Sequence, residues 1–330
     1  MSGPVIDPFC GSGTTLGEAQ RRGLPATGVD LNPIACLIAR VRTGRWDKGD
    51  GAKGLHHARE IRERALAARS STGVANRIPR IDHWFAPEIQ RALAGAVSYL
   101  GEVEPDWYDR VALSLSASIV RISRQESDTR YAAIEKRVTQ EQAATELSQA
   151  MVRICDWLAL REVPRPNARV EVRCQNAQDL SNLKAEHCAA AIFSPPYPNA
   201  YEYWLYHKYR MYWLGFDPIA VREEELGARP HYCKPNGLTE DDFAAQMGDV
   251  FKGLSRCLRP SAPVVVVIGD SVIGGRTVDN GRLILDVAAG QGFTALAQSK
   301  RTIRRRRSSF NSTHGHGRLE EHVLLLRRAR

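Results

Sequence analysis

The first 45 residues alternate between strand-like and helix-like segments, and this alternation restricts the fold more than any other feature of the chain. An apolar run at residues 4–10 enters a glycine turn, and a helix is expected at 14–22 because Gly23 is a residue type common just after helix ends. A second strand is predicted at 26–31, followed by a helix that begins at Pro33. This succession predicts a parallel α/β sheet.

Five more strand-like runs follow later and bring the expected sheet to seven strands; they lie at residues 170–174, 189–193, 264–268, 294–303 and 322–326. The last two are joined without room for a helix, so they are expected to pair antiparallel. Between 46 and 166 the apolar spacing is helical instead, and we interpret this segment as a helical insertion. The expected organisation is a first α/β part at 1–45, the insertion at 46–166, and a second α/β part at 167–330.

Composition narrows the class of partner. The formal net charge of +9, with cations gathered at Lys300, Arg301 and residues 304–307, favours a polyanionic partner. The seven cysteines form no Cys-x-x-Cys pair, so neither a zinc site nor a disulfide framework is expected, and no metal-binding residues are predicted. No apolar run is long enough to span a bilayer, and no signal peptide is recognisable, so the expected location is the cytoplasm, without membrane contact.

A turn with two glycines follows the first strand and is a candidate for binding a nucleotide-type cofactor. Gly11 and Gly13 let the backbone approach a ligand, and the helix after them directs N–H groups toward it. Asp30 ends the second strand, where a carboxylate can accept hydrogen bonds from both hydroxyls of a ribose. Leu16 stands where the third glycine of a dinucleotide-binding Gly-x-Gly-x-x-Gly belongs, which disfavours that class. A purely structural turn is the alternative.

The tetrapeptide Ser194-Pro195-Pro196-Tyr197 ends the strand-like run at 189–193. Its prolines stiffen the turn and restrict where the Pro195 carbonyl points. That carbonyl and Ser194 Oγ can accept hydrogen bonds, and Tyr197 offers an aromatic face for stacking. A Pro-Pro turn of no functional consequence is the alternative for these residues taken alone.

Taken together, the stretch Asp7-Pro8-Phe9-Cys10-Gly11-Ser12-Gly13-Thr14 and the Ser194 turn resemble the two signature motifs of bacterial site-specific DNA amino-methyltransferases. Trp84-Phe85 and the stretches 123–127 and 194–213 are similar to a subgroup of that family with a helical insertion. The resemblance implies a Rossmann-like seven-stranded methyltransferase sheet, mostly parallel with an antiparallel last strand. It also implies S-adenosylmethionine as cofactor and double-stranded DNA as partner.

The resemblance assigns cofactor binding to residues of the first motif and of the strand ends: Asp7, Phe9, Cys10, Gly11, Gly13, Thr14, Asp30, Asn32 and Asp179. For Asp179, a solvated loop aspartate is an equally good interpretation. The catalytic residues it implies are Ser194, Pro195, Pro196 and Tyr197, where the acceptors hold the exocyclic amine and Tyr197 stacks on a flipped base. No cysteine follows a proline, so transfer is expected to be direct, without a covalent intermediate.

Serine at the first motif position is typical of the cytosine-N4 enzymes, which makes cytosine N4 the expected target. An adenine-N6 DNA enzyme, an RNA N2-guanine enzyme and an inactive nucleic-acid-binding remnant are the alternatives. Members of the family carry a helical segment before the first strand, whereas only Met1-Ser2-Gly3 precede it here. The chain is therefore expected to be truncated, to start at the wrong codon, or to depend on another polypeptide; a cognate restriction endonuclease is a further expected partner.

Aromatic and cationic residues alternate after the Ser194 turn, a mixture that suits base stacking and phosphate contact. A helix that packs its aromatic face into the core produces much the same pattern, and both interpretations stay open. The expected nucleic-acid contacts are Tyr201, Tyr203, Lys208, Arg210, Arg304, Arg305 and Arg306.

Overall fold

The computed structural model describes residues 3–71, 73–128, 130–161, 168–199, 202–232, 236–303 and 319–329. Its strands are β1 (Val5–Asp7), β2 (Ala26–Asp30), β3 (Val170–Cys174), β4 (Ala190–Phe193), β5 (Pro263–Gly269), β6 (Ser271–Ile273), β7 (Arg276–Val278), β8 (Phe293–Ile303) and β9 (Leu319–Arg328). Its helices are α1 (Thr14–Arg21), α2 (Pro33–Thr43), α3 (Asp50–Ala67), α4 (Ile81–Trp84), α5 (Pro87–Ser98), α6 (Pro105–Ile122), α7 (Gln140–Leu160), α8 (Tyr203–Trp213), α9 (Pro218–Glu224), α10 (Arg229–Tyr232), α11 (Glu240–Cys257) and α12 (Asn280–Gly290), with short 3-10 turns at Val74–Arg77 and Tyr99–Gly101.

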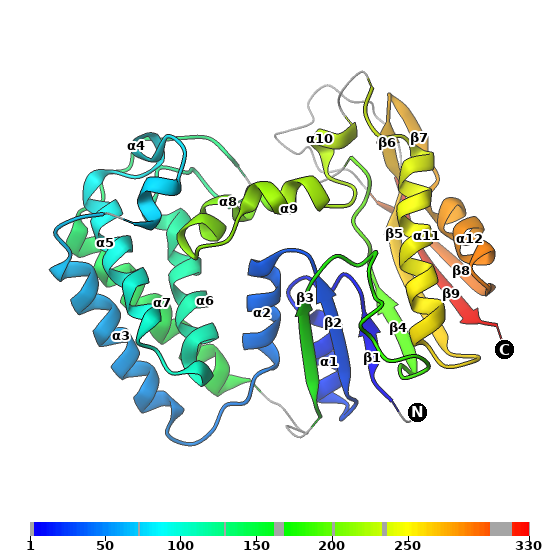
Figure 1. The fold of residues 1–330 in the computed structure, drawn as a ribbon, viewed down its shortest axis with the longest axis horizontal. Helices are drawn as coiled ribbons and strands as arrows, with labels where there is room; N and C mark the ends of the chain where they lie inside the picture. Colours follow the sequence, from blue (N-terminus) through cyan, green and yellow to red (C-terminus); the bar gives the residue numbers. More distant parts are fainter. Residues whose placement is uncertain are drawn as a thin grey trace. The chain divides into compact units, whose positions relative to one another are not determined.

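Seven strands form one sheet in the order β3-β2-β1-β4-β5-β9-β8 (Figure 1). The pairs from β3 to β5 are parallel, while β9 runs antiparallel to both β5 and β8. This is the expected Rossmann-like methyltransferase sheet, and the seven strands predicted from the sequence are the seven that form it. The chain places β1 centrally, builds outward to β3, and then returns to the other side of β1 with β4.

The chain divides into two compact units. The sheet unit comprises residues 1–32, 164–203 and 224–330, and the helical unit comprises 33–163 and 204–223. The sequence predicts boundaries at 45 and 166, so α2 and the segment 204–223 are grouped differently from that expectation. The reason is packing: α2 lies against α6, and the aromatic rings of Tyr209 and Trp213 on α8 pack against Phe85.

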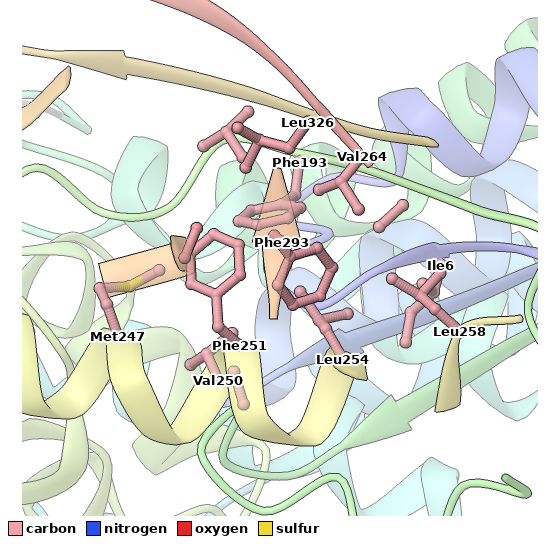
Figure 2. Packing of buried hydrophobic residues seen from close by; sticks show 14 of the residues in the cluster. Ile6, Phe193, Met247, Val250, Phe251, Leu254, Leu258, Val264, Phe293 and Leu326 are labelled. Carbon is pink, nitrogen blue, oxygen red and sulfur yellow. The ribbon is translucent and has the colours of Figure 1, made fainter. Parts of the chain in front are cut away.

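The core of the sheet unit lies between the sheet and α11 (Figure 2). Helix α11 begins with a capping box in which the Thr239 and Asp242 side chains bond reciprocally to backbone N–H groups. Its buried face presents Phe251, whose ring lies 6.1 Å from the ring of Phe193 and 5.4 Å from that of Phe293. In Figure 1, α11 and α12 lie beside β5, β8 and β9. The strand that carries the Ser194 turn is therefore anchored in this core through Phe193.

Some elements are not predicted by the sequence pattern. A two-stranded ribbon, β6 with β7, follows β5 directly, and α9 and α10 are short helices in a region without clear periodicity. These segments contain too few residues for a repeating apolar pattern, which explains why the sequence does not reveal them. Among the helices that the structure describes, none has both the length and the apolarity that a bilayer crossing requires.

Candidate functional site

The loop between β1 and α1 has a backbone that only glycine adopts comfortably. Gly11 has a φ of 49° and Gly13 a φ of 80°, both in the left-handed region. Gly13 is the N-cap residue of α1, so the loop leads straight to the N–H groups of the first helical turn. A loop of this kind fits an electron-rich ligand group placed against backbone donors.

Asp30 ties this loop to the end of β2. Its Oδ2 accepts a hydrogen bond from Gly11 N at 2.8 Å, and its Oδ1 accepts one from Asn32 N at 2.9 Å. The neighbouring backbone bond from Cys10 N to the Val29 carbonyl measures 2.9 Å. The structure thus brings together the glycine turn and the carboxylate that the sequence assigns to one cofactor site.

Cys10 packs beneath the loop, where it lies against β2. A side chain at Gly28 would place its Cβ only 2.5 Å from Leu16 Cδ1 and 2.9 Å from Cys10 Sγ, so glycine lets α1 and the loop approach the strand. Burial raises the pKa of the Cys10 thiol, which keeps it protonated and unreactive. Cys10 shapes this site as a packed, neutral side chain.

Asp7, the last residue of β1, is buried with 4% of its surface exposed. Its Oδ1 accepts a hydrogen bond from Phe9 N at 3.0 Å. Burial raises the pKa of Asp7 to about 7, and the nearby Asp30 adds to that increase. Burial raises the pKa of Asp30 as well. Two carboxyl groups with raised pKa values at one edge of a sheet mark a candidate functional site.

Asp7→Asn is expected to stabilise the ligand-free protein more at pH 8 than at pH 5. In the unfolded chain Asp7 ionises near pH 4; in the folded protein it keeps its proton up to about pH 7. Its contribution to stability is therefore complete below pH 4 and is lost as the pH rises through 7. Thermal melting from pH 5 to 8 measures the difference.

Asp179→Asn is the control. Hydrogen bonds from Ser181 lower the pKa of this exposed residue, so the effect of the substitution on the melting temperature should stay constant from pH 5 to 8. Equal melting shifts for Asp7→Asn at both pH values would contradict the expectation.

The Ser194 turn begins directly after β4, which is the neighbour of β1 in the sheet. The two strands pair with Ile6 opposite Ala191, and the ring of Phe9 lies 6.0 Å from that of Phe193. The glycine loop and the Ser194 turn therefore lie at the carboxyl ends of adjacent parallel strands. This edge is the switch point of the sheet, where the chain direction reverses and ligands of α/β proteins bind.

The turn itself is held from two sides. Gly227, with a φ of 72°, lets its own segment lie close to the Ser194 turn. A Cβ at this position would lie 3.3 Å from the Tyr197 carbonyl oxygen and 3.4 Å from Pro196 Cβ. Asn199 N donates to the Gly227 carbonyl at 2.9 Å, and Asn199 Nδ2 donates to the Val272 carbonyl at 2.6 Å.

The two acceptors of the turn differ in exposure: Ser194 is exposed, whereas Pro195 is buried. Among the described residues, neither Ser194 Oγ nor the Pro195 carbonyl has a hydrogen-bond partner.

The remaining residues of the expected cofactor set have less distinctive surroundings. Thr14 is exposed as the first residue of α1, and Asn32 is buried beyond β2. Asp179 follows β3 on the exposed surface, where its Oδ1 accepts a hydrogen bond from Ser181 N at 3.0 Å. Both interpretations of Asp179 are compatible with this position.

Two of the expected nucleic-acid contacts are engaged inside the helical unit. The Arg210 guanidinium is buried; it donates to the Ser116 carbonyl at 3.1 Å and pairs with Asp128. Lys208 Nζ lies 5.6 to 5.8 Å from three ring centroids, those of Tyr131, Tyr209 and Trp204, and burial lowers its pKa. For these two residues the structure favours packing of the helix over phosphate contact.

The other expected contacts have different outcomes. Tyr203, at the start of α8, is 44% exposed, and its N–H donates to Glu225 Oε1 at 2.8 Å. Tyr201, Arg304, Arg305 and Arg306 lie outside the described residues.

The sequence reasoning missed the end of β5. Asp270 follows this strand directly, as Ser194 follows β4, and its Oδ1 lies 2.8 Å from Nε2 of the fully buried His322. Asp279 Oδ1 lies 3.6 Å from the same nitrogen, and the candidate ligand atoms of the three side chains lie within 4.8 Å of one another. The hydrogen bond from His322 to Asp270 accounts for their proximity. The sequence signal for this position is the polar residue Asp270 directly after the apolar run of β5.

Two curated proteins share local sequence similarity with the chain. Over 43 residues it is 46% identical to the type II methyltransferase M.MjaII of Methanocaldococcus jannaschii, which is 13% of this chain and 8% of that protein. Over 89 residues it is 30% identical to the type II methyltransferase M.MvaI of Kocuria varians, 26% of this chain and 20% of that protein. The matched segments thus span only a small part of both relatives. No protein-family model matches the chain.

Solved methyltransferase structures resemble the chain more distantly. A SAM-dependent methyltransferase from Methanosarcina mazei has a TM-score of 0.37 at 10% identity, with 99% of this chain and 93% of that chain covered. A DNA modification methylase from Thermus thermophilus, solved with S-adenosyl-L-methionine, has a TM-score of 0.29 at 16% identity, with 47% and 53% covered. These TM-scores are low, so the fold is assigned from the strand order β3-β2-β1-β4-β5-β9-β8 of the chain itself. The chain has a Rossmann-like methyltransferase sheet and is similar, over limited segments, to type II methyltransferases.

Proposed function

We propose that this protein is an S-adenosylmethionine-dependent DNA methyltransferase that methylates an exocyclic amino group, the N4 of cytosine. The observation that carries the proposal is the position of the two motifs at the carboxyl ends of β1 and β4, joined by the contact of Phe9 with Phe193. A cofactor loop and a pair of hydrogen-bond acceptors at one switch point support a group transfer, because such an arrangement would bring its two reactants side by side. The local similarity to type II methyltransferases supports the same activity.

The described residues fit the cofactor. S-adenosylmethionine carries a ribose and supplies a methyl group from a sulfonium. In this proposal Asp30, which already bonds to Gly11 N, also accepts hydrogen bonds from the ribose hydroxyls, and the loop from Phe9 to Gly13 encloses the amino-acid part. Asp179, one strand farther out at the end of β3, is available to the adenine.

The catalytic part of the proposal belongs to the Ser194 turn. Ser194 Oγ and the Pro195 carbonyl accept hydrogen bonds from the target NH2, which withdraws its lone pair from the ring and makes the nitrogen nucleophilic. The nitrogen forms its bond to the methyl carbon as the carbon–sulfur bond breaks, and the amine then loses one proton to solvent. Tyr197 stacks on the base while it is outside the duplex. We assign cytosine N4 as the target because Ser194 stands at the first position of the motif. We also propose that the protein acts on host DNA in the cytoplasm, together with a cognate restriction endonuclease.

Expression in a bacterial host without DNA methylation, followed by single-molecule sequencing of its DNA, tests the proposal. N4-methylcytosine at a recurring sequence is the expected result, and N6-methyladenine instead would refute the cytosine assignment. Calorimetry with S-adenosylmethionine tests the cofactor separately. No binding at millimolar cofactor would refute the enzyme and favour an inactive nucleic-acid-binding protein.

Asp30→Ala is expected to weaken S-adenosylmethionine binding by about 100-fold or more, because hydrogen bonds to a charged partner contribute about 1.5–3 kcal/mol each. Calorimetric dissociation constants measure the loss. Glu18→Gln is the matched control: this exposed carboxylate on α1 pairs with Arg21 and Arg22 and should leave the affinity unchanged. A shift of less than about threefold for Asp30→Ala would remove this residue from the proposed site.

A further inference from the structure

The Tyr197 ring lies on a row of residues that crosses three strands of the sheet. Gly269 at the end of β5 pairs directly with Glu321 on β9, and Glu321 pairs with Arg301 on β8. Residues directly opposite one another in a sheet share a face, so these three positions form one surface. Tyr197 reaches this surface from the turn after β4.

Gly269 provides the contact surface for the ring. A Cβ at this position would lie 2.7 Å from Tyr197 Cε2, closer than real Cβ atoms come to a neighbour, and 3.2 Å from Cδ2, which is a tight contact. Any other residue at 269 would therefore displace the ring from its present plane. The absence of a side chain at Gly269 lets the ring lie directly on the strand.

Glu321 fixes the other end of the ring. The Tyr197 hydroxyl donates a hydrogen bond to Glu321 Oε1 at 3.3 Å, and Oε2 of the same carboxylate pairs with Arg301. Glu321 is 9% exposed, so this charge is taken out of water and held by its partners. On the opposite face of β9, His322 bonds to Asp270 at 2.8 Å and to Gln298 Nε2 at 3.1 Å, which secures the strand itself.

We propose that Gly269 and Glu321 form a seat that sets the plane and reach of the Tyr197 ring before the base arrives, with Glu321 as a positioning residue. The inference rests on the proposed function, because it assigns Tyr197 the task of stacking on the flipped base. A ring already held in its working orientation avoids the entropic cost of ordering it on binding. The seat acts on the base only, since the cofactor is held by the β1 and β2 loops.

A double-mutant cycle between Glu321 and Tyr197 tests this role. Transfer of labelled methyl groups to plasmid DNA from a methylation-free host gives kcat/KM for DNA. Glu321→Ala and Tyr197→Phe each remove the same hydrogen bond and should each lower kcat/KM by about tenfold. The double variant should lie within about twofold of either single variant, because the bond can be lost only once. Calorimetric affinity for S-adenosylmethionine should stay within about twofold throughout, because Gly269 and Glu321 contact the Tyr197 ring and not the glycine loop that the proposal assigns to the cofactor.

Three further variants separate positioning from a structural role. Glu321→Gln keeps an oxygen acceptor and should restore most of the activity, whereas Gly269→Ala should displace the ring and cost about tenfold with unchanged cofactor affinity. Glu320→Gln is the matched control, since this neighbour on β9 pairs with Lys300 at 3.1 Å and not with Tyr197.

The outcomes separate the inference from the proposed function. Multiplicative losses of about 100-fold in the double variant, or full activity of both Glu321→Ala and Gly269→Ala, would overturn the seat. A wild-type protein that binds no cofactor and methylates no DNA would overturn the proposed function instead. Wild-type methylation is measured before any variant, so the two failures cannot be confused.

Discussion

Ser194→Ala is expected to lower the rate of methyl transfer by about 100- to 1000-fold at saturating DNA and cofactor. In the proposed mechanism, the substitution removes one of the two acceptors that bind the amine as positive charge develops on nitrogen, and the loss of one such group commonly costs that much in kcat. The effect should fall on kcat, because the proposal assigns cofactor binding to other residues, those of the β1 and β2 loops. Combining Ser194→Ala with Tyr197→Ala should bring modification of host DNA below detection.

Initial rates with labelled cofactor measure this loss, and sequencing of host DNA checks it in the cell. Ser299→Ala is a suitable control, because Ser299 is an exposed serine on β8 in the same compact unit. A Ser194→Ala protein that retains more than about a tenth of the wild-type rate would exclude Ser194 as an acceptor of this importance. The same reaction in the Ser299→Ala protein should run at the wild-type rate.

Phe251→Ala is expected to destabilise the sheet unit by about 3–5 kcal/mol, a large share of the stability of an ordinary domain. Its ring is fully buried on α11 and packs against Phe193 and Phe293 (Figure 2). Removing it leaves a cavity beneath the strand that carries the Ser194 turn, and well-packed neighbours close such cavities only in part. Catalytic activity should therefore be lost at a lower temperature than in the wild type.

The measurement must report the sheet unit alone. All six tryptophans lie in the helical unit, at positions 46, 84, 107, 157, 204 and 213, so tryptophan fluorescence follows the wrong unit. Hydrogen exchange of the amides in β4 and β5, followed by mass spectrometry, reports the opening of the sheet itself. Leu296→Ala on β8 is the control, since this side chain is 48% exposed and should cost under about 1 kcal/mol. Similar losses of protection in both variants would show that Phe251 has no special place in the core.

Local patterns reveal much of the candidate site. The apolar run before Ser194 and the stiff Pro-Pro turn mark a strand end, and Gly11 and Gly13 occupy positions with positive φ that few other residues adopt. These features depend only on residues that are close together in the chain, so the sequence alone predicts them. Lys208 and Arg210 show the opposite case: their charge and spacing indicate a phosphate contact, whereas burial among Tyr131, Trp204 and Asp128 is a matter of packing.

The sequence by itself determined seven strands, the glycine loop, and the turn at Ser194, because apolar periodicity and turn residues act over a few positions. Only the tertiary structure decided that β1 and β4 are neighbours, although residues 8–189 separate them in the chain. It also decided the register that sets Gly269 opposite Glu321 beneath the Tyr197 ring. Strand order and register follow from the burial of whole faces against α11 and α12, and a pairing shift of one residue would reverse every side chain along β9. Such cooperative packing is a property of the folded chain as a whole.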